Sequence, residues 1–239
     1  MRHLIKSPAG FLLILWLTAL ACTIPGTGSE APAATPTPDG DSTVFSNIPY
    51  TVSLESGDIV PGSQLQYVGK TGDLFNVKID GVPTQKRTAD SFFWSGIVAP
   101  GVFVNYNLRV APDIFGPFTV AGPVEVTVLK PMPAPLNTNI LPDWPDAIQY
   151  NNIGLLRNVP TGEVIAGTTL VFEGVSKQGE VESVQLSGLS GHPLFASGDS
   201  ITWVGTLRDN VAIRYTFRVV SFSENSLQLA GTAELLVNP

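Results

Sequence analysis

Residues 211–219 read VAIRYTFRV and residues 227–237 read LQLAGTAELLV. Apolar residues alternate with polar or shorter ones in both stretches, and the polar run from Ser223 to Ser226 separates them. A period of two is typical of a β-strand with one buried face, and two such runs around a short polar turn predict a β-hairpin. Residues 102–110 and 118–128 repeat the pattern around a turn from Pro112 to Pro117. The chain is therefore expected to be all-β, and no stretch after residue 21 has the apolar stripe of an amphipathic helix.

The chain also repeats itself at a larger scale. Asp90-Ser91-x-x-Trp94-x-Gly96 recurs 109 residues later as Asp199-Ser200-x-x-Trp203-x-Gly205. Such self-similarity predicts a tandem duplication. At the same shift, Val102, Tyr106, Arg109, Val110, Gly122, Glu125 and Val128 recur as Val211, Tyr215, Arg218, Val219, Gly231, Glu234 and Val237. At slightly smaller shifts, Gly62, Leu65, Gly69, Val77 and Gly81 match Gly167, Leu170, Gly174, Val184 and Gly188.

Proline sets the boundaries between the expected units. Residues 131–145 carry five prolines, which interrupt strands and helices, while Ile140 and Trp144 suggest that this linker lies against a domain surface. We expect two tandem copies of a small antiparallel β-sandwich or partly open β-barrel, at residues 44–130 and 146–239. Further strands are predicted at residues 64–68, 75–80, 92–98, 169–173, 181–186 and 201–207.

One stretch of each unit resembles a known family. Residues 62–69 read GSQLQYVG and are followed by Val77-x-Ile79-x-Gly81. This order is similar to the start of bacterial SH3-like cell-wall modules. The resemblance implies a small β-barrel and does not indicate any ligand-binding residue.

The N-terminus is typical of an exported protein. Arg2 and Lys6 precede an apolar run from Phe11 to Ala21, which is the order of a secretory signal peptide and is shorter than the about 20 residues of a transmembrane helix. Ala19-Leu20-Ala21-Cys22 resembles the lipobox of bacterial lipoproteins. That resemblance implies cleavage after residue 21 and acylation of Cys22. The alternative is an ordinary signal peptide, because Ala19-x-Ala21 also satisfies the small-x-small cleavage rule.

The composition after the signal peptide limits the classes of partner. Residues 22–43 are rich in Thr, Pro, Gly and Ala and predict a stalk that cannot bury enough apolar surface to fold. Removing Arg2 and Lys6 leaves 11 of the 13 Lys+Arg against 20 Asp+Glu, a formal charge of −9. Such a chain repels phosphate backbones, so no nucleic-acid partner is expected. We expect membrane attachment through acyl chains on Cys22, and a cell-envelope polymer or a surface protein as a further partner.

The repeated residues are the candidates for ligand binding. An exposed Trp94 or Trp203 would form a stacking platform for a sugar ring, but both share the strand phase of core residues, which favours burial. Arg109 and Arg218 would grip a carboxylate, or would each pair with an acid of its own unit, which we prefer. Asp90 and Asp199 precede strands and are typical of turn residues whose side chains bond the nearby backbone.

Catalytic chemistry finds little support in the sequence. His192 is the single histidine after the signal peptide, and Cys22 is the single cysteine, so no catalytic residue, metal site or cofactor is expected. His192 is expected in an exposed loop. We predict a lipid-anchored, surface-displayed tandem β-module protein acting in binding or envelope structure. It would lie on the outer side of the cytoplasmic membrane or in the outer membrane. The alternative is an accessory protein of cell-wall or polysaccharide degradation, either carbohydrate-binding or a hydrolase with weak motifs.

Overall fold

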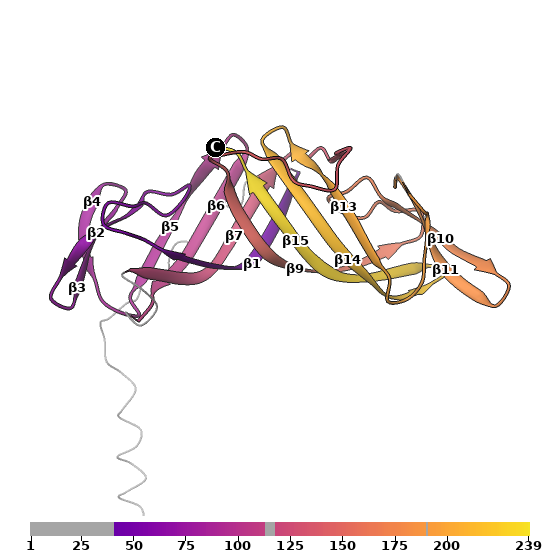
Figure 1. The fold of residues 1–239 in the computed structure, drawn as a ribbon, viewed down its shortest axis with the longest axis horizontal. Coiled ribbons are helices and arrows are strands. Elements are labelled where there is room, and N and C mark those ends of the chain that lie inside the picture. The colour runs from indigo at the N-terminus through magenta and orange to yellow at the C-terminus, as the bar shows by residue number, and fades with distance from the viewer. Residues whose placement is uncertain (1–40, 113–117, 190) are drawn as a thin grey trace, which may run out of the picture. The chain divides into compact units, whose positions relative to one another are not determined.

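The computed structural model describes residues 41–112, 118–189 and 191–239 (Figure 1). Among these residues the fold is all-β, without helix, as the alternation predicted. The expected signal peptide, Cys22 and nearly all of the predicted stalk lie outside the described residues, as does most of the turn before Phe118.

The first half contains two antiparallel sheets. A four-stranded sheet has the order β1-β7-β6-β5, and a three-stranded sheet has the order β2-β3-β4. Asp80 and Gly81, at φ 50° and 79°, form the two-residue turn between β3 and β4, where positive φ is required at both positions. The strands are β1 (Ser42–Ser53), β2 (Leu65–Thr71), β3 (Leu74–Ile79), β4 (Val82–Lys86), β5 (Ser91–Ala99), β6 (Val102–Val110) and β7 (Thr119–Leu129).

The second half repeats this strand order. Its larger sheet has the order β8-β13-β14-β15-β9, in which β9, β15, β14 and β13 correspond to β1, β7, β6 and β5. A three-stranded sheet of β10-β11-β12 accompanies it. The strands are β8 (Ala134–Pro135), β9 (Ile148–Pro160), β10 (Val171–Gln178), β11 (Val181–Ser187), β12 (Leu194–Phe195), β13 (Ser200–Arg208), β14 (Val211–Ser223) and β15 (Ser226–Val237).

Strands β1 and β9 were not predicted from the sequence, and both contain the same irregularity. The pairing of β1 with β7 shifts register between Phe45 and Ile48, and Asn47 there has φ 55°. The pairing of β9 with β15 shifts at the matching place, where Asn152 has φ 56°. A bulge adds one residue to a strand, so buried residues lie three apart rather than two. The interruption hides both strands from a search for alternation.

The proline-rich segment between the halves lies against the second half through residues 132–136, whereas Ile140, one of the two residues that suggested such packing, is exposed. Ala134 and Pro135 of β8 pair with Thr206 and Gly205 at the edge of β13. The amide of Met132 donates to Leu207 O (2.7 Å), and that of Leu136 donates to Val204 O (2.9 Å). Residues 132–136 therefore add a short strand to the sheet.

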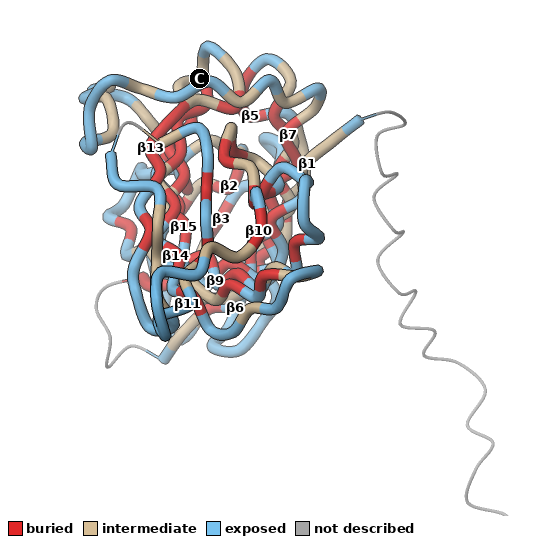
Figure 2. Tube along the Cα trace, turned by 90° about the vertical axis from the view of Figure 1, so that its right-hand side faces the viewer, coloured by how far each residue is buried: buried red, intermediate tan, exposed pale blue. Residues whose placement is uncertain are grey.

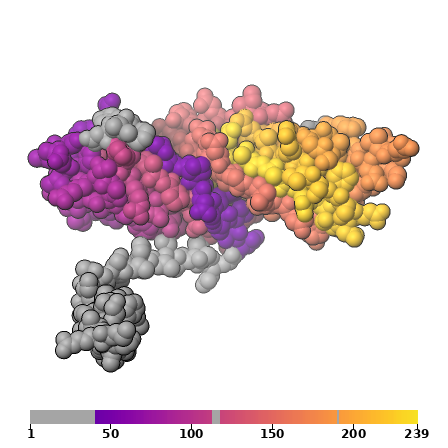
Figure 3. Space-filling model, turned by 90° about the horizontal axis from the view of Figure 1, so that it is seen from below, coloured from indigo at the N-terminus to yellow at the C-terminus, as the bar shows by residue number. Residues whose placement is uncertain are grey.

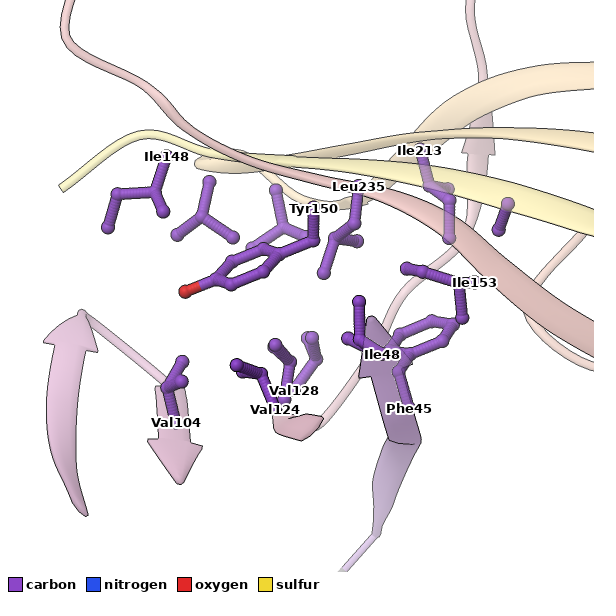
Figure 4. Close-up of a cluster of buried hydrophobic side chains, with 14 of the residues drawn as sticks. Phe45, Ile48, Val104, Val124, Val128, Ile148, Tyr150, Ile153, Ile213 and Leu235 are labelled. Carbon is purple, nitrogen blue, oxygen red and sulfur yellow. The ribbon is translucent and has the colours of Figure 1, made fainter. Parts of the chain in front are cut away.

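The two larger sheets share a buried core. Figure 2 shows the buried residues, in red, gathered on the strands. In Figure 4, Ile148, Tyr150, Ile153, Ile213 and Leu235 of the second half face five residues of the first half, namely Phe45, Ile48, Val104, Val124 and Val128. All ten belong to one hydrophobic cluster that continues through both halves.

Polar contacts also join the halves. The hydroxyl groups of Tyr106 and Tyr150 lie 2.7 Å apart within hydrogen-bonding reach. Arg208, at the end of β13, donates from Nη1 to Leu129 O (2.6 Å), and Asn210 donates from Nδ2 to Pro100 O (3.2 Å). Figure 3 shows atoms of the two halves in direct contact. Each half therefore supplies hydrogen-bond partners to polar groups of the other half.

Candidate functional site

The two repeated tryptophans are buried. The side chains of Trp94 and Trp203 are 8% and 3% exposed, as their strand phase predicted. Their indole nitrogens are satisfied differently, since Trp94 Nε1 donates to Asp80 Oδ1 (2.8 Å) and Trp203 Nε1 donates to Thr169 Oγ1 (3.2 Å). A ring that is buried to this extent offers no platform on which a sugar could stack.

The glycine two residues after each tryptophan explains the repeated Trp-x-Gly. A Cβ at Gly96 would lie 2.5 Å from Trp94 Cζ2, and a Cβ at Gly205 would lie 2.2 Å from Trp203 Cη2. Each indole therefore lies over a position that only glycine leaves open. The repeated motif is a packing unit.

Gly231 provides a sharp test of this structural interpretation. A Cβ there would lie 2.1 Å from Thr216 O and 2.9 Å from Phe217 Cα, both on the neighbouring backbone. Gly231→Ala must displace β14, and we expect it to lower the free energy of unfolding by about 3 kcal/mol. Gly154→Ala is the matched control, because nothing lies within 4 Å of its added Cβ. Urea unfolding measures both variants, and equal stabilities would contradict the close approach.

The repeated aspartates form turns, as predicted. Asp90 Oδ2 accepts a hydrogen bond from the amide of Arg87 (2.7 Å), and Asp199 Oδ2 accepts one from the amide of Ala196 (2.8 Å). Both carboxylates are thus bound to the backbone three residues upstream, a local pattern that stabilises a turn.

The expected ion pairs of Arg109 and Arg218 are not observed, so that prediction was wrong. Both side chains are exposed, and Arg109 Nη1 makes a 3.4 Å hydrogen bond to Ala89 O. Within the described part of the chain, neither side chain contacts a carboxylate. The reason is register. Arg218 stands opposite Ser200 and Ala230, whereas Glu234 lies four residues further along β15, roughly 13 Å away at about 3.3 Å per residue.

The acid of the repeat pairs with an arginine that the sequence pattern did not single out. Arg214 Nη2 donates to Glu234 Oε1 (2.6 Å) and Oε2 (2.5 Å), and both side chains are about one-third exposed. A signal was present in the sequence. The turn pairs Ser223 with Ser226, and a regular ladder that continued from this pair would set every odd-numbered residue opposite an even-numbered one. The inward-facing residues of both strands are odd-numbered, however, and must stand opposite one another to share one face of the sheet. One bulge, found between Val219 and Ser221, resolves this conflict and sets Arg214 opposite Glu234.

Two arginine variants separate the paired from the unpaired position. Arg214→Ala leaves the Glu234 carboxylate without its partner, and we expect a loss of about 1 kcal/mol. Arg218→Ala removes an exposed side chain without a carboxylate partner, and we expect a change within about 0.5 kcal/mol. Thermal unfolding of the two variants side by side tests the assignment. A larger loss for Arg218→Ala would restore the structural role first expected of it.

A tyrosine cluster lies where the halves meet. Tyr106 donates to Pro61 O (2.7 Å), and its ring packs edge-on to Tyr50, with centroids 5.5 Å apart. Burial raises the pKa of Tyr50 to about 12. Burial also raises the pKa of Tyr106, and its neighbours Tyr150 and Tyr50 raise it further. Burial raises the pKa of Tyr150, although the hydrogen bond with Tyr106 lowers it in part. Burial raises the pKa of Tyr215, and nearby Arg157 opposes this only in part. These hydroxyls therefore stay protonated at neutral pH.

The remaining chemistry-bearing residues do not form a site. His192 is exposed in a loop, as predicted. Among the described residues, no three His, Cys, Asp or Glu side chains gather in a way that would hold a metal ion. None of the described segments forms a helix with the length and apolarity that a membrane span requires. Cys22, the predicted lipidation residue, lies outside the described residues.

Comparisons with known proteins leave the class open. No protein-family model matches the chain, and no curated protein or solved structure matches it either. The residues and their geometry are therefore the basis for proposing a function.

Proposed function

We propose that this protein is an exported lipoprotein, anchored through acyl chains on Cys22 and displayed at the cell surface, whose two β-modules act in binding or in envelope structure rather than in catalysis. One observation carries the non-catalytic part. Most of the residues that recur in both halves are buried core residues, glycines at close approaches, and turn aspartates. The exceptions are the exposed Arg109 and Arg218, and the acids Glu125 and Glu234, of which Glu234 pairs with Arg214. What the halves have in common is therefore mainly packing chemistry.

We further propose that the halves are duplicated copies of one module. Three features support this: the common strand order, the paired bulges at Asn47 and Asn152, and the matching turns before β2 and β10. In those turns, Ser63 Oγ donates to Val60 O and Thr168 Oγ1 donates to Ile165 O, both at 2.8 Å. A copy fused to its twin gains a larger shared core than either would have alone.

Burial of the tryptophans weighs against a carbohydrate-binding accessory role. Stacking on a sugar needs an exposed aromatic face, whereas Trp94 and Trp203 are covered. The acidic charge instead favours partners with basic groups, through electrostatic complementarity.

Replacement of Cys22 tests the anchor. Cys22→Ala removes the sulfur that would carry the lipid, and we expect the protein to move from the membrane fraction to the soluble fraction. Ser29→Ala, a similarly small change in the same proline-rich stretch, is the control and should stay with the membranes. Mass spectrometry of the purified N-terminus should show acylated Cys22 as the first residue. Unchanged membrane association of Cys22→Ala would exclude this anchor.

A further inference from the structure

One cross-strand pair at matching positions of the two halves differs in charge. In the second half, Arg214 on β14 stands opposite Glu234 on β15 and donates to both carboxylate oxygens. In the first half, Asn105 on β6 stands opposite Glu125 on β7 in the same register. The first half therefore retains the acid of the pair and lacks its guanidinium group.

A small pocket of about 140 Å³ lies beside Glu125. Its lining is rich in hydrogen-bond acceptors. Asn105 Oδ1 is buried and accepts no hydrogen bond within the described part of the chain. Among the described residues, Glu125 Oε2 accepts one hydrogen bond, from Ser46 Oγ (3.0 Å), and this leaves most of the acceptor capacity of the carboxylate unused. The residues around the pocket are Asn47, Asn105, Asn107, Pro123, Val124 and Glu125.

A ligand for this pocket must be positively charged and rich in N–H donors. A guanidinium group meets both conditions, because its planar fork of five N–H donors matches a carboxylate and a neighbouring acceptor together. The second half contains such a pair at the matching positions, where the Glu234 carboxylate binds the guanidinium group of Arg214. The net charge of −7 also steers basic partners toward the protein.

We propose that the pocket at Glu125 binds the guanidinium group of an arginine side chain on a partner polypeptide. The proposal goes beyond the function proposed above and does not depend on the anchor at Cys22. The pocket is a point of recognition on the outer face of the β6–β7 hairpin, opposite the shared core.

Side-chain amide resonances of the full chain, labelled with ¹⁵N, give a direct test. The probe is the tripeptide acetyl-Gly-Arg-Gly-amide, and we expect it to shift the Asn105 and Asn107 resonances with millimolar affinity. The same peptide with citrulline keeps the shape and loses the charge, and should cause no shift. The lysine peptide should bind several-fold more weakly, because an ammonium group is a point charge without the planar fork. Equal shifts from the arginine and citrulline peptides, or equal affinities for the arginine and lysine peptides, would overturn the proposal.

Two variants tie the binding to the pocket. Glu125→Gln should weaken the arginine peptide roughly tenfold, because it removes the charge from the hydrogen bonds. Asn105→Arg should recreate the pair seen in the second half, abolish peptide binding and raise the melting temperature by about 2 to 4 °C. Arg214→Asn should in turn create a second site, seen as new shifts of the backbone amides of Thr216 and Glu234. Undiminished binding by Glu125→Gln or by Asn105→Arg would refute this site.

Discussion

Produced separately, residues 41–130 and residues 131–239 are expected to fail to fold, and to recover native structure only when mixed. Phe45, Ile48, Tyr150 and Ile153 are buried in the core that the two halves share. Exposing four such side chains would cost roughly 6 to 12 kcal/mol, at about 1.5 to 3 kcal/mol each. That loss is comparable to the entire stability of a typical domain, about 5 to 15 kcal/mol.

Near-ultraviolet circular dichroism and urea unfolding measure this outcome. The control is the full chain cleaved at a protease site placed in the exposed segment from Asn137 to Ile140, which keeps both halves together. We expect the cleaved protein to retain the native spectrum and a single cooperative transition. If either half alone unfolds cooperatively with a native-like spectrum, the shared core is not required for folding.

Trp203→Ala is expected to destabilise the protein more than the glycine and arginine substitutions above, with a loss of about 3 to 5 kcal/mol. The indole is 3% exposed, packs 6.0 Å from the Tyr215 ring centroid, and lies over Gly205. Its removal leaves a cavity that the surrounding strands cannot close, because they are fixed by their own ladders. The melting temperature should fall by roughly 10 °C or more.

The control for this variant is Leu156→Ala, since Leu156 is 79% exposed and contributes little burial. We expect its melting temperature to remain within about 1 °C of the wild type. A Trp203→Ala protein as stable as Leu156→Ala, combined with loss of polysaccharide binding, would instead identify Trp203 as a ligand platform.

The alternation of apolar and polar residues along single strands was sufficient to predict most of the secondary structure. The hairpins β6–β7 and β14–β15 were predicted because Val104 and Tyr106, or Ile213 and Tyr215, mark one buried face directly. Trp94 and Trp203 were predicted to be buried because they occupy the apolar positions of the same alternation, and both are buried in the structure. Local chemistry was equally informative, since the turn hydrogen bonds of Asp90 and Asp199 depend on residues only three positions away.

Strands β1 and β9 were not predictable by the same means. Each contains a bulge at an asparagine with positive φ, and the bulge changes the spacing of buried residues from Phe45 to Ile48 and from Tyr150 to Ile153. Both bulges lie upstream of the glycines that align between the halves. A period of two identifies regular strands only, so an extra residue at the centre of a strand conceals it.

The sequence by itself determined the strand class, the buried face of each hairpin and the turn role of the repeated aspartates, because these depend on neighbours along the chain. The tertiary structure alone decided what each face packs against and which charges meet. Tyr150 reaches Tyr106 because two sheets pack face to face, and Arg214 rather than Arg218 reaches Glu234 because a bulge sets the register. Periodicity states that a residue is buried, but its partner depends on the pairing of strands far apart in the sequence, which no local pattern encodes.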